Sequence, residues 1–419
     1  MMKKKHVQMI TGIDIGSTAM RVVVGQCAQE DGRQCHIQIL GAIEVPSSGV
    51  HKGAVTSIEE TVSSLSHALE QTERLVGVPI EHAWIGISGP FIQIQQSKGV
   101  IAVAKADGEI SPEDVGRALE AARTVAPPLN YEVLHVLPKS YTVDGQSGIK
   151  DPIGMTGIRM EVDVQLIHGA TAQLKNITKA VYRTGIDIDD LVLSILATGD
   201  VVTTSRQREL GTAVINMGGS TTSLAVYEEG DLLHTAIIPI GSEHITNDLA
   251  IGLRTSIDVA ERVKLEWGHC DSDAFTKKDI VDLFDAGAEY HENISRQYIS
   301  EIVGARVLEI LEKIDQELVR VGRSGLLPAG VIFTGGGAKI QGLVPYAKDV
   351  LRLPATLGYP IDLSSATEKA QDIAFATVVG LVKWAALLNE ERGGASSLRF
   401  TGANKMLQKM KEFAKSLIP

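Results

Sequence analysis

The first 45 residues alternate between apolar and polar positions in a pattern typical of short β-strands. Three strands are predicted between His6 and Val45, with clear alternation in HIQILGAIEV and a turn at residues 30–32. Ser57 followed by Glu60 predicts a capping box, and the apolar spacing that follows predicts a helix packed on the sheet. HAWIGISG predicts a further strand.

The pattern changes between residues 81 and 167. Ser111 and Pro112 predict a helix start, because serine is a favoured N-cap and proline a favoured first helical residue. Strand-like stretches flank this helix, including RMEVDVQLI, in which Met160 begins an alternation of apolar and polar residues. We interpret this region as a subdomain inserted into a larger fold.

The second half of the chain repeats the pattern of the first. A helix predicted near residues 171–183 precedes the strand-turn-strand block TAVINMGGSTTSLAVYEEGDLLHTAIIPIG. Within it INMGGST resembles the earlier IDIGST, so that Asn216 occupies the position of Asp14. The chain is therefore predicted to contain two related halves.

Further elements are predicted beyond this block. Amphipathic spacing predicts a helix around Thr246 to Trp267 and a long helix around Asn293 to Val321. The strand GVIFTGGGAKI follows, and a helix is predicted from about Ala366. All of this indicates an α/β protein.

Composition narrows the class of protein. A chain of 419 residues with 44% hydrophobic and 22% charged positions can form two lobes with separate cores. A formal net charge of -11 argues against a nucleic-acid partner, because phosphate neutralisation needs clustered Lys and Arg. The start of the chain shows no secretion signal. The apolar run at residues 373–388 contains Lys383 and is too short to span a bilayer, which predicts a buried helix and a cytoplasmic protein unless something anchors it.

Three glycine-rich turns after predicted strands indicate a nucleotide site. Backbone N–H groups and hydroxyls in such turns can surround phosphate oxygens, and Gly16 allows close approach because it has no Cβ. Asp14 is expected to hold Mg²⁺ through water, as is the amide of Asn216. The first two turns are expected to face each other across the phosphates, and the third is expected to contact the nucleoside. The expected contact residues are Gly16, Ser17, Thr18, Gly218, Gly219, Ser220, Thr221, Gly335, Gly336, Gly337 and Ala338.

Together these turns resemble the actin, Hsp70 and sugar-kinase superfamily, whereas any one of them alone is common in many folds. Within that resemblance AERVK is similar to the segment that grips ribose and adenine. Glu261 is then expected to accept from ribose hydroxyls and Lys264 to lie against the nucleoside. The alternative is a plain surface ion pair between residues three apart on a helix.

Longer segments resemble the FtsA family of bacterial cell-division proteins, namely GVHKGAVTSIEET, VLHVLPKSYTVDGQSGIKDPIGMTGIRMEV, ILATGD, HTAIIPIG and FTGGGAKIQGL. The resemblance implies an actin/Hsp70-like ATPase fold of two lobes, in which an inserted SHS2-like subdomain replaces one actin subdomain. The implied parts are a first-lobe core (1–80, 168–195 and 360–388), the inserted subdomain (81–167), a second-lobe core (196–242 and 325–359), a partner-binding subdomain (243–324), a flexible linker (389–404) and an amphipathic helix (405–419).

The resemblance also implies a function. Members of the family bind ATP with Mg²⁺, polymerise, and bind the tubulin-like protein FtsZ through the subdomain that holds the long helix. Later division proteins are expected on the inserted subdomain, and the protein is expected to be peripheral, on the cytoplasmic face of the cell membrane at the division site. Arg296 and Arg306 align with positions near the FtsZ-binding surface, although solvated helix charges are an equally simple explanation.

The final segment favours attachment to a membrane. On a helix from Lys405 to Pro419 the apolar residues fall on one face and lysines fall beside or opposite it, which suits anionic lipid headgroups. A tail packed on the protein itself, or in a partner's groove, is the alternative. The expected membrane-contacting residues are Met406, Leu407, Lys409, Met410, Phe413, Leu417 and Ile418.

Asn216 departs from the Asp usual in the family. An amide can orient a water but cannot act as a general base, so ATP binding with slow or absent hydrolysis is expected. Asp200 is the one nearby acidic residue considered as a substitute.

Two other functions remain open on the sequence. A small-molecule kinase of the same superfamily needs a carboxylate base beside a polar cleft, and no motif for one is found. A PilM-like pilus-assembly adaptor shares the glycine turns and the insertion but typically lacks the tail helix.

Overall fold

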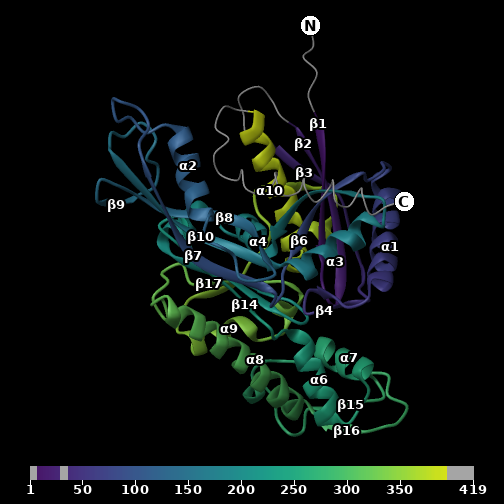
Figure 1. Cartoon of the computed structure of the whole chain (residues 1–419). Coiled ribbons are helices and arrows are strands. Elements are labelled where there is room, and N and C mark those ends of the chain that lie inside the picture. The colour runs from purple at the N-terminus through teal and green to yellow at the C-terminus, as the bar shows by residue number, and fades with distance from the viewer. Residues whose placement is uncertain (1–6, 29–35, 394–419) are drawn as a thin grey trace.

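Two β-sheets with nearly the same strand order lie at the centre of the computed structural model, which describes residues 7–28 and 36–393 (Figure 1). The first sheet has the order β11-β6-β1-β2-β3-β19 and the second has the order β18-β17-β12-β13-β14. In each, an antiparallel hairpin carries a glycine turn, and the first strand of that hairpin also pairs in parallel with a later strand. The two related halves predicted from the sequence are confirmed.

The strands of the first sheet are β1 (Val7–Ile15), β2 (Ala19–Ala28), β3 (His36–Pro46), β6 (His82–Ile87), β11 (Asp187–Leu193) and β19 (Ser364–Ser365). Those of the second are β12 (Thr212–Met217), β13 (Thr222–Glu228), β14 (Asp231–Ile238), β17 (Val331–Thr334) and β18 (Ala355–Leu357).

Helices and short strands surround the first sheet. In α1 the side chain of Ser57 accepts from the backbone N–H of Glu60, as the predicted helix start requires. A continuous core of aliphatic side chains joins the sheet to the helices. These elements are α1 (Ile58–Val76), α3 (Thr171–Tyr182), α4 (Ser194–Val202), α10 (Ala376–Gly393), β4 (Val50–His51), β5 (Ala54–Val55) and the 3₁₀ turns η3 (Glu368–Gln371) and η4 (Ile373–Phe375).

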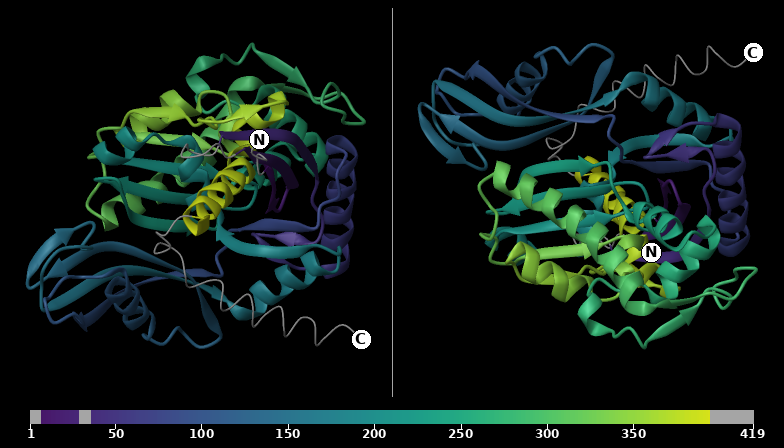
Figure 2. Two further views of the ribbon diagram at one scale, coloured as in Figure 1. Left: turned by 90° about the horizontal axis from the view of Figure 1, so that it is seen from above. Right: turned by 90° about the horizontal axis from the view of Figure 1, so that it is seen from below.

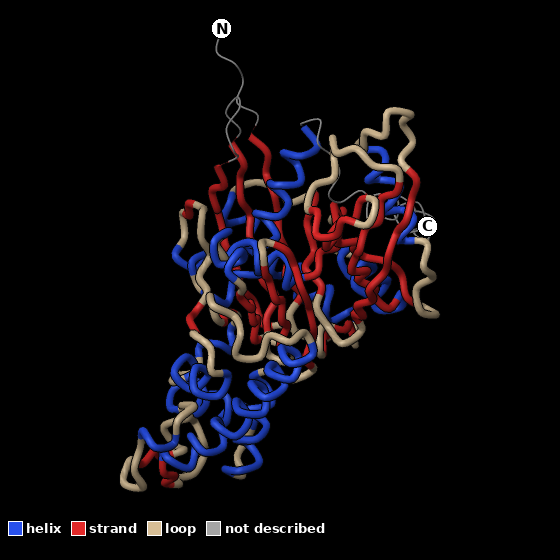
Figure 3. The backbone as a smooth tube through the Cα atoms, turned by 90° about the vertical axis from the view of Figure 1, so that its left-hand side faces the viewer, coloured by secondary structure: helices blue, strands red, loops and turns tan. Residues whose placement is uncertain are grey.

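Beyond the second sheet the chain forms a helical region that projects from the body (Figure 3). The long helix α8 buries one apolar face against a second core, which includes the fully buried Phe333 of β17. The elements of this half are α5 (Ser205–Leu210), α6 (Ser242–Leu253), α7 (Ile257–Trp267), η1 (Ser272–Ala274), β15 (Ile280–Asp282), β16 (Asn293–Ser295), α8 (Arg296–Arg320), η2 (Gly336–Lys339) and α9 (Leu343–Leu351).

The inserted region forms a separate sheet with one helix, set to the side of the two lobes (Figure 2). Its core is small, and the alternating residues of β10 supply much of it. Ser111 and Asp114 form a capping box at the predicted start of α2. The elements are α2 (Pro112–Arg123), β7 (Ile92–Ala102), β8 (Tyr131–Val143), β9 (Gln146–Ile149) and β10 (Arg159–Ala170).

Three element boundaries differ from the sequence predictions. The single helix expected from Thr246 to Trp267 is two helices, because Arg254 adopts a left-handed conformation with φ of 53° and Ser256 caps α7. The last helix begins at Ala376 rather than near Ala366, after two 3₁₀ turns. It continues to Gly393, so the first five residues of the expected linker are helical. The predicted membrane-contacting residues lie outside the described residues.

Candidate nucleotide-binding site

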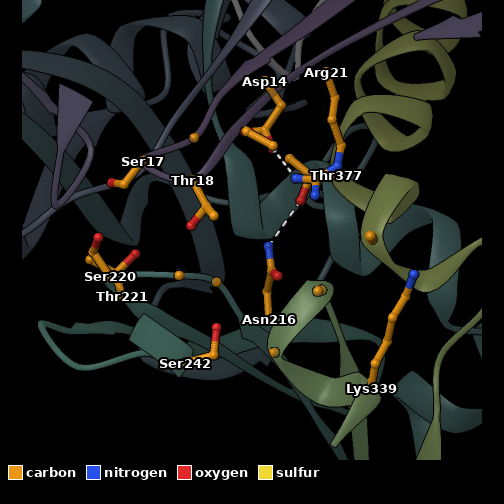
Figure 4. Close-up of a pocket in the computed structure, with 18 of the residues that line it drawn as sticks. Asp14, Ser17, Thr18, Arg21, Asn216, Ser220, Thr221, Ser242, Lys339 and Thr377 are labelled. Carbon is orange, nitrogen blue, oxygen red and sulfur yellow. Dashed lines mark hydrogen bonds and ion pairs between the residues drawn. The ribbon is translucent and has the colours of Figure 1, made fainter. Parts of the chain in front are cut away.

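A cavity of about 570 Å³ lies between the two sheets, and residues of all three glycine turns line it (Figure 4). This volume is in the range of small-molecule sites. Every residue predicted to contact the nucleotide or metal lines the cavity except Ala338, which is buried with 2% of its surface exposed. Segments more than 300 residues apart in the sequence, such as Gly16 and Gly336, therefore meet at one site.

The first turn joins β1 to β2. A Cβ on Gly16 would lie 2.6 Å from the carbonyl oxygen of Ala19, so this tight turn requires glycine. Asp14 is paired across the hairpin with Arg21, whose Nη1 lies 4.0 Å from Asp14 Oδ2. Arg21 Nε also donates to Glu44 Oε2 at 2.6 Å.

Asp14 is electrostatically unusual. Burial raises the pKa of its carboxyl group, and the opposing effect of Arg21 does not cancel that rise. The positive charge of Arg21 therefore offsets only part of the cost of desolvating this carboxylate. A cation bound beside it would favour the ionised form, which suits the predicted metal role.

The second turn joins β12 to β13. Asn216 Nδ2 donates to Thr377 Oγ1 at 2.9 Å, and that hydroxyl lies 3.0 Å from Thr198 Oγ1. With its amide donor engaged in this way, the group that Asn216 can offer to a metal-bound water is its carbonyl oxygen. The Asn216 amide cannot take up a proton at neutral pH.

The two turns touch across the lobes. A Cβ on Gly219 would lie 1.9 Å from Thr18 Oγ1, so glycine is needed for this approach. The carboxylate of Glu243 accepts from Thr18 Oγ1 at 2.8 Å and from Ser220 Oγ at 2.5 Å. One acidic side chain thus connects the first lobe to the second.

Glu261 and Lys264 lie on α7 at the edge of the cavity. Lys264 Nζ donates to Glu261 Oε2 at 2.5 Å and to Thr246 Oγ1 at 2.9 Å. Only 6% of the Lys264 side chain is exposed. Glu261 and Lys264 therefore form the ion pair between residues three apart that was the alternative to nucleoside contact. The pair is part of the cavity wall and not of the outer surface.

Several residues of the cavity wall were missed in the sequence. Lys339 follows the third turn directly and forms an ion pair with Asp372 at 2.6 Å. Arg21 could have been found from the register of the first hairpin, which places it opposite Asp14. The cavity wall has three acidic residues (Asp14, Glu44 and Glu261) and three basic ones (Arg21, Lys264 and Lys339), so their charges balance.

The proposed substitute for the missing Asp is not in the site. Asp200 does not line the cavity and instead pairs with Arg208 at 2.5 Å. Among the described residues no cluster of three His, Cys, Asp or Glu side chains could hold a metal on its own. Mg²⁺ commonly takes most of its ligands from waters and substrate phosphates.

Arg296 and Arg306 both have partners within the chain. The Cζ atom of Arg296 lies 4.1 Å above the ring of Phe275. Arg306 donates to both carboxylate oxygens of Asp248, at 2.6 and 2.9 Å. Their assignment to a partner surface stays a prediction.

Comparison with known proteins places this site in a family. The model of cell division protein FtsA matches residues 213–380, and that of the SHS2 domain inserted in FtsA matches residues 89–168. Cell division protein FtsA of Pseudomonas aeruginosa is 35% identical over 90% of this chain and 89% of its own length. The Bacillus subtilis protein of that name is 38% identical over 90% of this chain and 83% of its own length.

The chain belongs to the FtsA family. Its fold also resembles more distant solved structures. A PilM-PilN type IV pilus biogenesis complex matches with a TM-score of 0.63 at 15% identity, covering 90% of this chain and 98% of the other. MreB5 of Spiroplasma citri bound to ADP matches with a TM-score of 0.53 at 12% identity, covering 92% and 98%. These confirm the actin-like ATPase fold of this FtsA-family chain, and at such identities they show the fold alone.

Within residues 7–28 and 36–393, every helix is too short or too polar to cross a bilayer.

Proposed function

We propose that this FtsA-family protein binds ATP with Mg²⁺, forms filaments, and anchors FtsZ to the cytoplasmic face of the membrane at the division site. In this proposal it also recruits later division proteins through the inserted subdomain. The observation that carries the nucleotide part is the single cavity at which the turns after β1, β12 and β17 converge. Hydroxyls and backbone groups from both lobes face one another there, which is the arrangement needed to hold a polyphosphate.

Asp14 and Asn216 are proposed to hold Mg²⁺ through water. Asp14 brings a partly buried carboxylate with a raised pKa, and Asn216 brings a neutral carbonyl oxygen. The ion supplies positive charge that neutralises phosphate oxygens. Because Asn216 contacts the Thr377 hydroxyl and cannot accept a proton, we infer that hydrolysis is slow or absent.

The helical region at residues 243–324 is proposed as the FtsZ-binding subdomain. Ile251 of α6 and Ile257 of α7 are 77% and 54% exposed, and so leave apolar surface available to a partner. Arg296 and Arg306, at the start and middle of α8, are proposed as contact residues of the same subdomain. Exposed apolar side chains suit a partly apolar peptide.

The lysine-rich segment 405–419 is proposed as the membrane anchor. It follows the end of α10, and its sequence combines apolar residues with lysines that favour anionic lipids. One short helix of this kind binds weakly. Several copies on a filament bind together with a higher effective concentration, which gives polymerisation a physical purpose.

Co-sedimentation with vesicles of phosphatidylglycerol and phosphatidylcholine tests the proposal. The intact protein is expected to sediment with vesicles in the presence of ATP and Mg²⁺ and to bring FtsZ with it. Deletion of residues 405–419 is expected to leave both proteins in the supernatant while ATP binding is unchanged. A matched control replaces Lys409, Lys411 and Lys415 by Glu, which keeps the apolar residues and reverses the charge.

The results separate the parts of the proposal. Vesicle binding that survives the deletion contradicts the anchor. Failure of the wild-type protein to bind ATP contradicts the nucleotide site. FtsZ that stays in solution while this protein sediments contradicts the tether.

A further inference from the structure

The start of α6 is fixed to the second glycine turn and reaches the first. The backbone N–H groups of Ser242 and Glu243 donate to the carbonyl oxygens of Gly218 and Gly219, at 3.0 and 2.8 Å. These bonds use helix N–H groups that lack partners within the helix. They hold the Glu243 backbone against the second turn whatever the side chain does.

The Glu243 side chain occupies a position between the two turns. Its Oε1 accepts from the Thr18 hydroxyl of the first lobe and its Oε2 from the Ser220 hydroxyl of the second, at 2.8 and 2.5 Å. An acidic residue in the first turn of a helix is favourable for the helix dipole alone. That explanation does not account for the bond to Thr18, which lies 225 residues away in the sequence.

Both hydroxyls belong to turns assigned above to phosphate. A carboxylate oxygen and a phosphate oxygen are both anionic acceptors of hydrogen bonds, so they compete for the same O–H donors. A carboxylate between the turns also repels the negative charge of a polyphosphate. The Glu243 carboxylate thus joins the two turns by occupying hydroxyls that phosphate oxygens would otherwise use.

We propose that Glu243 is an internal competitor of the nucleotide phosphates, whose carboxylate must release Thr18 and Ser220 when phosphates enter. Glu243 thereby lowers the affinity most for the nucleotide that carries the most phosphate groups. This inference rests on the proposed nucleotide function of the cavity. It predicts that the effect of Glu243 grows from adenosine to ADP to ATP.

Glu243→Gln tests the proposal, because an amide keeps the size of the side chain and removes its charge. ATP affinity, measured by isothermal titration calorimetry with Mg²⁺, is expected to rise about tenfold, the effect of losing one charge-assisted competing contact. The rise for ADP is expected to be smaller, and adenosine affinity is expected to stay unchanged. Glu301→Gln on the exposed side of α8 removes the same charge far from the turns and is the matched control.

Glu243→Asp provides a second variant. Its side chain keeps the charge but is one methylene shorter, so it cannot span both hydroxyls, and an intermediate gain in ATP affinity is expected. Circular dichroism checks that each variant is folded.

Two outcomes overturn the inference: ATP affinity that is equal or lower in both variants, or a gain as large for adenosine as for ATP. The first would mean that Glu243 organises the turns rather than competing for them. A wild-type protein that binds none of the three ligands contradicts the proposed function instead, so the two failures are distinguishable.

Discussion

The two glycine-turn hairpins share a topology but differ in the polar residue near the end of the first strand. In the first lobe Asp14 is a partly buried carboxylate with a raised pKa, and Arg21 lies 4.0 Å from it. In the second lobe Asn216 is a neutral amide that donates to Thr377. Strand order and register are nearly the same in both lobes, whereas charge and hydrogen bonding are not.

This difference shows that the two turns share their backbone geometry but not their ionisable group. Backbone geometry is retained in both, because the glycines and the antiparallel pairing determine it. The ionisable group is retained in only one, so the two lobes cannot perform the same chemistry on a shared ligand. We assign metal binding chiefly to the first lobe, and substitutions that exchange the two residues test this asymmetry.

Asp14→Asn makes the first hairpin resemble the second and is expected to have the largest effect. Loss of the carboxylate is expected to lower the Mg²⁺-dependent part of ATP affinity by about 100-fold, as for other losses at metal sites. Because the folded pKa of Asp14 is raised, its ionised form destabilises the fold at neutral pH. The variant is therefore expected to unfold at a higher temperature.

Calorimetric titration with and without Mg²⁺, and thermal unfolding at pH 7, measure both effects. The advantage of the variant in stability should shrink as the pH is lowered and Asp14 of the wild type becomes protonated. An unchanged dependence on Mg²⁺ would remove Asp14 from the metal site.

Asn216→Asp makes the second hairpin resemble the first. A carboxylate at this position can orient and deprotonate water, so phosphate release under single-turnover conditions is expected to rise by at least about tenfold. The Thr377 hydroxyl can then donate to the new carboxylate, which keeps the contact. Asn216→Ser serves as a control without a base, and equal rates for the two variants would contradict the explanation of slow hydrolysis.

Gly219→Ala and Gly16→Ala separate contact between lobes from contact within a hairpin. The new Cβ at Gly219 meets Thr18 of the other lobe, so the lobes can relieve it by opening, and ATP affinity is expected to fall about tenfold with little change in stability. The new Cβ at Gly16 meets Ala19 of its own turn, and unfolding free energy is expected to fall by about 2 kcal/mol.

Urea unfolding and ATP titration on both variants check this prediction. Gly116→Ala in α2, where an added Cβ meets nothing within 4 Å, is the control without a steric contact, and it is expected to gain about 0.5–1 kcal/mol of stability from helix propensity. A larger loss of stability for Gly219→Ala than for Gly16→Ala would contradict it.

His135→Asn probes a contact between the inserted subdomain and the first lobe and is expected to have the smallest effect at neutral pH. His135 of β8 accepts from the Leu193 N–H at 3.1 Å, and burial lowers its pKa to about 4. The unfolded chain takes up a proton near pH 6.5 and the folded chain does not, so wild-type stability falls as pH drops toward 4. The His135→Asn variant is expected to lose less stability over the same fall in pH.

The difference in unfolding free energy between the two proteins should change by about 2 kcal/mol from pH 7 to pH 5. Urea titration at the two pH values measures it. His168, which is buried with a lowered pKa, is intact in both proteins and so cancels in the comparison. Parallel pH profiles would mean that His135 is accessible to protons in the folded state.

Most of the candidate site could be predicted because it depends on local chain geometry. Strand alternation and glycine turns are encoded within a few residues, and so the turns at Gly16, Gly218 and Gly335 were found where the structure has them. Glu243 and Glu44 were not found, because no local motif marks them and only the folded arrangement brings them to the turns.

The helix boundaries that were missed also have local physical causes. Arg254 is one of the few residues other than glycine with a positive φ, and nothing in the apolar spacing reveals that break. Asp372 caps a 3₁₀ turn before α10, which delays a helix whose apolar pattern begins earlier. The spacing of apolar residues indicates which face of a helix is buried, but it does not indicate where the backbone changes direction.

The last helix separates the nucleotide cavity from the chain that follows residue 393. α10 begins at Ala376, beside the Thr377 that contacts Asn216, and runs unbroken to Gly393 (Figure 1). Eighteen residues at about 1.5 Å each give a rod of roughly 27 Å. A group fused to the chain after α10 is held that far from the nucleotide cavity. The end of α10 is therefore a suitable place for a fluorescent label or an exchanged anchor.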